Sequence, residues 1–123
     1  MNEILLYAAS AALTAWGIAH LLATRGVVAG FGELSADNRR ILTMEWIVEG
    51  VAFLSVAAFV AAATAVDRQA AVAGVVYAVA AASLVALAVV SLFTGFRIAF
   101  LPFRLCPFVL GSAAALIVLG AWL

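Results

Sequence analysis

Residues 41–94 read ILTMEWIVEGVAFLSVAAFVAAATAVDRQAAVAGVVYAVAAASLVALAVVSLFT. They form two long apolar runs with one short polar turn, residues 66–69, between them. A helix needs roughly 20 mostly apolar residues to cross the hydrocarbon core of a bilayer, and both runs exceed that length. Because backbone groups in lipid must be hydrogen-bonded within their own segment, the runs are predicted to be helices. The short turn predicts that they pack as an antiparallel hairpin.

Two further apolar runs complete the pattern, one before this hairpin and one after it. The chain has 123 residues, of which 69% are hydrophobic and only 10% charged, against about 25% charged residues in soluble globular proteins. Its mean hydropathy is +1.30. The sequence therefore predicts an all-α, polytopic membrane protein. We expect a single four-transmembrane-helix bundle over residues 1–123, with helices at about 4–24, 41–66, 70–94 and 107–123.

Charge and motifs exclude several classes of function. Six arginines balance six acidic residues and there is no lysine, so the chain has neither a basic patch for nucleic acid nor an acidic tail. Cys106 is the only cysteine, which excludes an intrachain disulfide. There is no phosphate-binding glycine loop, nucleophile elbow or metalloprotease motif. The expected partners are the lipid bilayer, small molecules and other membrane helices, and no nucleic acid.

The two longer connections carry most of the positive charge. Residues 25–40 and 95–106 hold five of the six arginines, and the opposite side of the predicted bundle holds only Arg68. Since short cytoplasmic loops carry the positive excess, we expect both connections on the cytoplasmic side of the inner cell membrane and both termini outside the cytoplasm. The second connection alternates phenylalanines with Arg97 and Arg104, which is typical of an interfacial segment, and Pro107 suits the first turn of the last helix.

Glu45 and Glu49 are the most unusual residues of the second predicted helix. A carboxylate at bilayer depth costs roughly 2.5 to 3.5 kcal/mol on insertion scales, so it needs a partner, a proton, an ion or a ligand. Four residues apart, the two lie on one helix face. Counted from Ile41 at a rise of 1.5 Å per residue, Glu45 lies roughly 6 Å and Glu49 roughly 12 Å below the helix start, the latter close to mid-bilayer. Burial and a like-charged neighbour both disfavour ionisation there.

Other polar and aromatic side chains are expected at the same end of the bundle. His20 lies four residues after Trp16 near the cytoplasmic end of the first helix, at a depth similar to that of Glu45. These positions predict a pocket that opens toward the cytoplasm beneath the two longer connections. Its expected lining residues are Glu49, Glu45, His20, Trp46, Trp16, Arg97 and Arg104. In the alternative interpretation, Glu45 pairs with Arg39, Arg40 or Arg97 near the surface, Glu49 is protonated and hydrogen-bonded to a neighbouring helix, and the tryptophans are interface anchors.

No metal or cofactor is predicted. His20, Glu45, Glu49 and Cys106 offer four donors for zinc, but their spacing matches no zinc signature and Cys106 is expected in a loop. Haem is the other possibility, because one histidine and one cysteine are available as iron ligands. Ligation by two histidines of one chain is excluded, since His20 is the only histidine.

Four segments carry a resemblance to known proteins. Residues 16–20 (WGIAH), 30–40, 44–50 (MEWIVEG) and 103–107 (FRLCP) together resemble a group of small bacterial four-helix membrane proteins of uncharacterised activity. More loosely, the architecture is similar to DoxX-like proteins and to sterol-isomerase-type membrane bundles, whose pockets combine acidic residues with an aromatic lining for lipophilic ligands. The resemblance implies a fold and a location, and no residue role.

The leading hypothesis is that the protein binds a small lipophilic or cationic molecule in this pocket, with Glu49 and Glu45 as proton or cation partners. One alternative is a small proton-coupled exporter of the multidrug type, acting as a dimer. Another is an accessory subunit of a larger membrane complex, since alanine-rich faces favour association with a partner or a second copy. Enzymatic chemistry on a lipid stays open, because a buried glutamate beside a histidine suits acid–base catalysis.

Overall fold

The computed structural model describes all residues, 1–123, and contains helices but no strands. Four helices are long and apolar enough to cross a membrane, which confirms the all-α four-helix class and the multi-pass prediction. A short fifth helix, α2, interrupts the first connection. The elements are α1 (Glu3–Leu22), α2 (Thr24–Ala29), α3 (Ala36–Asp67), α4 (Ala71–Thr94) and α5 (Leu101–Trp122).

Two helices begin before the spanning segments that the sequence predicts at about 41–66 and 107–123. Helix α3 starts at Ala36, where the Ser35 hydroxyl accepts a hydrogen bond from the Asn38 N–H at 3.1 Å and caps the first turn. Helix α5 starts at Leu101, so Pro102 takes the first turn and Pro107, expected there, lies inside the helix. An interior proline removes one backbone hydrogen bond, and its ring crowds the carbonyl four residues earlier. Pro107 is buried inside the helix, and membrane helices tolerate such a proline where neighbouring helices surround it.

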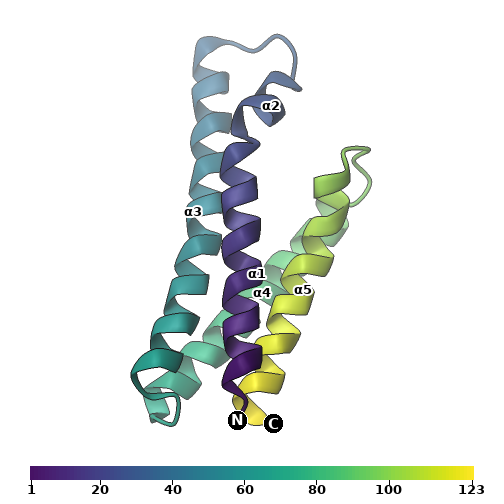
Figure 1. Cartoon of the computed structure of the whole chain (residues 1–123). Helices are drawn as coiled ribbons and strands as arrows, with labels where there is room; N and C mark the ends of the chain where they lie inside the picture. Colours follow the sequence, from purple (N-terminus) through teal and green to yellow (C-terminus); the bar gives the residue numbers. More distant parts are fainter.

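The four long helices form two antiparallel pairs. Helix α1 packs along α3, α4 packs along α5, and the pairs meet through α1 with α5 and α3 with α4. Both termini and the 68–70 turn lie at one end of the bundle, while α2 and the 95–100 connection lie at the other (Figure 1). Toward this second end, which we call the loop end, α4 and α5 lean away from α1 and α3.

The hydrophobic core occupies the half of the bundle near the termini. Its 16 buried residues include Leu6 and Leu13 of α1, Phe53 of α3, Tyr77 of α4 and Ile117 of α5, all of them fully or almost fully buried. Inside this core the Tyr77 and Thr64 hydroxyls lie 3.0 Å apart and bond to each other. Tight packing therefore joins the two helix pairs only in this half.

Polar contacts close the bundle near the termini. The Asn2 N–H donates to the Gly120 carbonyl at 2.7 Å, and the Arg68 guanidinium donates to the Glu3 carboxylate at 2.6 Å. Gly120 is needed for this approach, because a Cβ at that position would lie 3.0 Å from the Asn2 carbonyl oxygen and 2.9 Å from Leu6 Cγ. The first helix is thus attached to α3 and α5 at this end, and the bundle is looser at the other.

Candidate functional site

On the inward face of each long helix, the buried core residues give way to cavity-lining residues at about the same height in the bundle. On α1 the core residues Leu6, Ala9 and Leu13 are followed, at the three- and four-residue spacing of one helical face, by Trp16 and His20. The other three helices show the same change beyond their last core residue. Their residues at this level are Trp46 and Glu49 on α3, Leu87 and Ser91 on α4, and Phe103 and Cys106 on α5.

These residues line a cavity of about 440 Å³ between the two helix pairs, on the loop-end side of the core. Ten of its 16 lining residues are hydrophobic, so the wall is mainly apolar. Trp46, Phe100 and Phe103 supply aromatic surface. The side chains with polar atoms are Trp16, His20, Trp46, Glu49, Ser91, Thr94 and Cys106. A mainly apolar cavity with a few convergent polar groups is the usual form of a small-molecule site.

His20 is held rigidly in the cavity wall. Its imidazole stacks on the Trp46 indole, with ring centroids 3.9 Å apart and planes 9° apart, and Phe53 packs edge-on at 5.5 Å. The Trp46 indole N–H donates to the His20 carbonyl at 2.7 Å, which ties α3 to the last turn of α1. The side chain of His20 is only 7% exposed. This histidine is therefore a fixed, desolvated group that faces the cavity.

Close approach of α1 and α3 makes this arrangement possible. A Cβ on Gly17 would lie 3.2 Å from the Gly50 carbonyl oxygen, and one on Gly50 would lie 3.2 Å from His20 Cδ2 and 2.6 Å from Leu21 Cδ2. The two glycines thus permit the contact that brings Glu49 to His20. The segments WGIAH and MEWIVEG lie together in one site. Within it His20 and Trp46, which are 26 residues apart in the sequence, are in contact.

Glu49 lies at the edge of the cavity. Its Oε2 atom is 3.7 Å from His20 Nε2, which is close enough for an ion pair when the imidazole is protonated but too long for a hydrogen bond. The carboxylate side chain is 44% exposed and has no other ionic partner. Glu49 is thus a half-exposed acidic group beside a buried histidine.

Glu49 lies level with the last turn of α1. Helix α1 has 20 residues and is about 30 Å long, and His20, the neighbour of Glu49, lies in that last turn. Helix α3, with 32 residues, is about 48 Å long and extends past α1 at the loop end. The depth of Glu49 in the bilayer stays a prediction.

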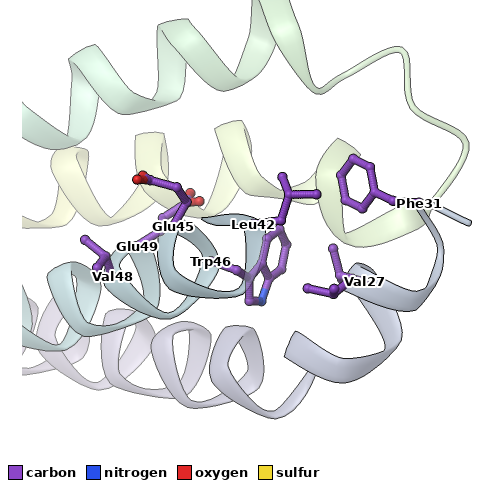
Figure 2. Close-up of a pocket in the computed structure, with 8 residues that line it drawn as sticks. Val27, Phe31, Leu42, Glu45, Trp46, Val48 and Glu49 are labelled. Carbon is purple, nitrogen blue, oxygen red and sulfur yellow. The ribbon is translucent and has the colours of Figure 1, made fainter. Parts of the chain in front are cut away.

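Glu45 lies on a different surface from His20. It is exposed and lines a smaller hollow of about 250 Å³ on the α2 side of α3, which Trp46 and Glu49 also border. Figure 2 shows the Glu45 and Glu49 side chains projecting on the same side of α3. The alternative pairing of Glu45 with an arginine does not form, since Arg40 bonds instead to Asp37 at 3.3 Å. Glu49 alone borders both hollows as an acidic group.

The two predicted arginines lie outside the cavity. Arg97 and Arg104 are exposed and neither forms an ion pair. The Arg104 Nε–H instead donates to the Ile98 carbonyl at 3.1 Å, which holds the 95–100 connection against the start of α5. Arg104 thus orders the connection beside the cavity, and neither arginine has the predicted lining role.

Several lining residues were not expected from the sequence. The Ser91 hydroxyl and Cys106 thiol lie 3.5 Å apart, and Cys106 belongs to α5 instead of the loop where it was expected. Ser91 follows the core residue Leu84 by seven positions, and Phe103 precedes Leu110 by seven. This spacing, extended from the core along each helix, is the signal that would have identified them.

Two buried polar atoms in the wall lack a strong hydrogen-bond partner. His20 Nε2 has none, and the Trp16 indole Nε1 has only the weak acceptor sulfur of Cys106 beside it. They lie one helical turn apart on α1 and both belong to residues that line the cavity. The four potential zinc donors are not gathered, because no group of three or more His, Cys, Asp or Glu side chains converges.

The chain was compared with protein-family models, curated proteins and solved structures. No family model, curated protein or solved structure matches it.

Proposed function

We propose that the protein binds a small lipophilic molecule in the cavity between its two helix pairs, with the polar end of the molecule near His20 and Glu49. The observation that carries this proposal is the buried His20 Nε2, which has no hydrogen-bond partner, in a mainly apolar wall. Beside it the Trp16 indole N–H has only the weak acceptor sulfur of Cys106. Buried polar groups of native proteins are almost always hydrogen-bonded, and a bound molecule with a polar end would supply partners to both groups.

The dimensions and surface of the cavity support a small organic ligand. Its volume of about 440 Å³ lies within the range of about 300–1,000 Å³ typical of small-molecule pockets. The aromatic rings of Trp46 and Phe103, 5.6 Å apart and inclined at 64°, provide a continuous apolar surface. An amphiphilic molecule matches both the apolar wall and its polar end.

Glu49 is the proton or cation partner in this proposal. It is the one carboxylate at the cavity, and its Oε2 atom, 3.7 Å from His20 Nε2, is close enough to pair with the imidazole when that ring is protonated. Glu45 has a secondary place, because it borders only the outer hollow.

The proposed location is the inner membrane, with the cavity toward the cytoplasm. Arg25, Arg39, Arg40, Arg97 and Arg104 all lie at the loop end, and Arg68 alone lies with the termini. The positive-inside rule then places both termini outside the cytoplasm.

Native mass spectrometry of gently extracted protein tests the binding function. We expect a small molecule to accompany the wild type and the Glu45→Gln variant, and its occupancy to fall in Glu49→Gln. The two variants are a matched pair, since the same chemical change is made one turn apart on α3. Equal occupancy in all three would exclude the role of Glu49. Recovery only of a stoichiometric protein partner would favour an accessory subunit.

A proton-coupled exporter is the second candidate. The cavity lies toward the loop end, whereas the opposite end is closed by the Asn2–Gly120 and Glu3–Arg68 contacts, as an inward-facing carrier requires. Reconstituted vesicles with an imposed proton gradient test this candidate. Uptake of a lipophilic cation that is lost in Glu49→Gln would support export, and binding without uptake would exclude it.

A further inference from the structure

The Trp16 indole determines which atom of a ligand it can meet. An indole N–H only donates, so its partner must be an acceptor. The Cys106 thiol lies beside the ring and is its hydrogen-bond neighbour, but sulfur is a weak acceptor. In an apolar cavity an N–H without a strong acceptor is costly. A ligand that fits this site therefore presents an oxygen, or another strong acceptor, to Trp16.

The groups beside Trp16 place a second demand on the same ligand. Glu49 is an acceptor when ionised, and His20 Nε2 is an acceptor in one neutral tautomer of the imidazole. The two atoms lie 3.7 Å apart, so neither satisfies the other by a hydrogen bond. The polar end of the cavity thus combines one obligate donor with a neighbouring pair that takes a proton.

Common head groups differ in how well they meet both demands. A ketone accepts from Trp16 but offers no proton to His20 or Glu49. An ammonium group pairs with Glu49 but offers no acceptor to Trp16. A carboxylate would face Glu49 as a like charge. A hydroxyl accepts and donates at one oxygen, so of these four head groups it is the one that bonds to both sides without a buried charge.

We propose that the cavity selects a lipophilic alcohol, whose hydroxyl accepts from the Trp16 N–H and donates to the His20–Glu49 pair while its hydrocarbon part lies against Trp46, Leu87 and Phe103. This inference rests on the proposed binding function and names its ligand class. The hydroxyl can belong to a free long-chain alcohol or to a neutral glycerolipid.

The test uses probes of one chain length that differ only in their polar end. Full-length protein in nanodiscs is titrated with 1-decanol, 2-decanone, decylamine and decane at matched mole fraction in lipid, and dioctanoylglycerol represents the glycerolipid source. The readout is the indole ¹H–¹⁵N spectrum, in which the three tryptophans give three signals. Trp46 already donates to His20, and Trp122 is exposed, so Trp16 is the indole that gains a bond.

We expect 1-decanol to move the Trp16 signal downfield, to saturate, and to bind more tightly than decane or decylamine. Trp16→Phe keeps the aromatic bulk and removes the donor. It should weaken decanol binding roughly two- to tenfold, as expected for one hydrogen bond, and leave decane binding unchanged. Trp122→Phe is the matched control and should change neither. If Trp16→Phe does not fold, the chemical shift of the Trp16 indole in the wild type, measured with each probe, still tests the proposal.

The outcomes separate this inference from the binding function. Three results would each overturn the alcohol assignment and leave the binding function intact. These are equal affinity for decanol and decane, equal affinity for decanol and decanone, and highest affinity for decylamine. The absence of saturable binding by any probe would overturn both. Tighter saturation by dioctanoylglycerol than by decanol would support the assignment and identify the glycerolipid source.

Discussion

The imidazole of His20 stacks face to face on the indole of Trp46, with centroids 3.9 Å apart and planes 9° apart. The same indole donates its N–H to the His20 carbonyl, so one residue of α3 holds both the ring and the backbone of the last turn of α1. The histidine that faces the cavity is therefore positioned by a residue 26 positions along the chain, at the end where the two helix pairs diverge.

Trp46→Phe should lower the free energy of unfolding by about 1–2 kcal/mol, since it removes a hydrogen bond and part of the ring stack. Thermal unfolding in detergent measures the change. Trp122→Phe, an exposed tryptophan at the end of α5, is the control and should be close to neutral. A larger loss in the control than in Trp46→Phe would contradict the anchoring role.

Gly120→Ala should destabilise the bundle by about 1–3 kcal/mol, the usual range for overpacking. The added methyl would meet the Asn2 carbonyl oxygen at 3.0 Å and separate α1 from α5 at the closed end. Gly111→Ala lies on the same helix with nothing within 4 Å of its Cβ position, so it should be neutral or stabilising. Equal melting temperatures of the two variants would argue against the contact.

Thr64→Val should destabilise the core by about 1 kcal/mol. The Thr64 hydroxyl donates to the Val60 carbonyl at 2.7 Å, so Tyr77 is the donor in their 3.0 Å bond and loses its acceptor in the variant. In a double-mutant cycle with Tyr77→Phe, the combined loss should be smaller than the sum of the two single losses. Tyr7→Phe, at an exposed tyrosine, is the control.

Cys106 should report occupancy of the cavity. Its thiol is half-buried, lies 3.5 Å from the Ser91 hydroxyl and lines the wall, so a small membrane-permeant maleimide should modify it slowly. Saturation of the cavity with ligand should slow the reaction further, as intact-protein mass spectrometry measures. Cys106→Ser should remain unmodified. A rate independent of every bound lipophile would place the ligand elsewhere.

The proposed orientation is tested with single cysteines in the Cys106→Ser background. Gln69→Cys, in the turn near the termini, should react with a membrane-impermeant maleimide in intact cells. Glu33→Cys, in the connection before α3, should react only after the membrane is permeabilised. The reverse pattern would show that the cavity faces outward.

The sequence determined the class of fold because lipid leaves a chain few choices. Apolar runs of spanning length must satisfy their backbone internally, so four long helices followed from composition and length alone. The spacing of Glu45 and Glu49, and of Trp16 and His20, likewise follows from helix geometry within single segments. His20 and Trp46 lie near helix ends in the sequence, which predicted that both are in the loop-end half of the bundle.

The tertiary structure decided which of those residues share a site. In a membrane helix the lipid-facing and core-facing sides are both apolar, so hydropathy does not show which face meets a neighbour. Close packing at Gly17 and Gly50 brings Glu49 beside His20, while Glu45, one turn away, borders the outer hollow. The same packing placed Arg97 and Arg104 outside the cavity and Ser91 and Phe103 in its wall. The sequence by itself determined the helices and the position of their polar residues along each helix. Only the packing decided which helix faces meet, because the face that a helix buries depends on the helices around it.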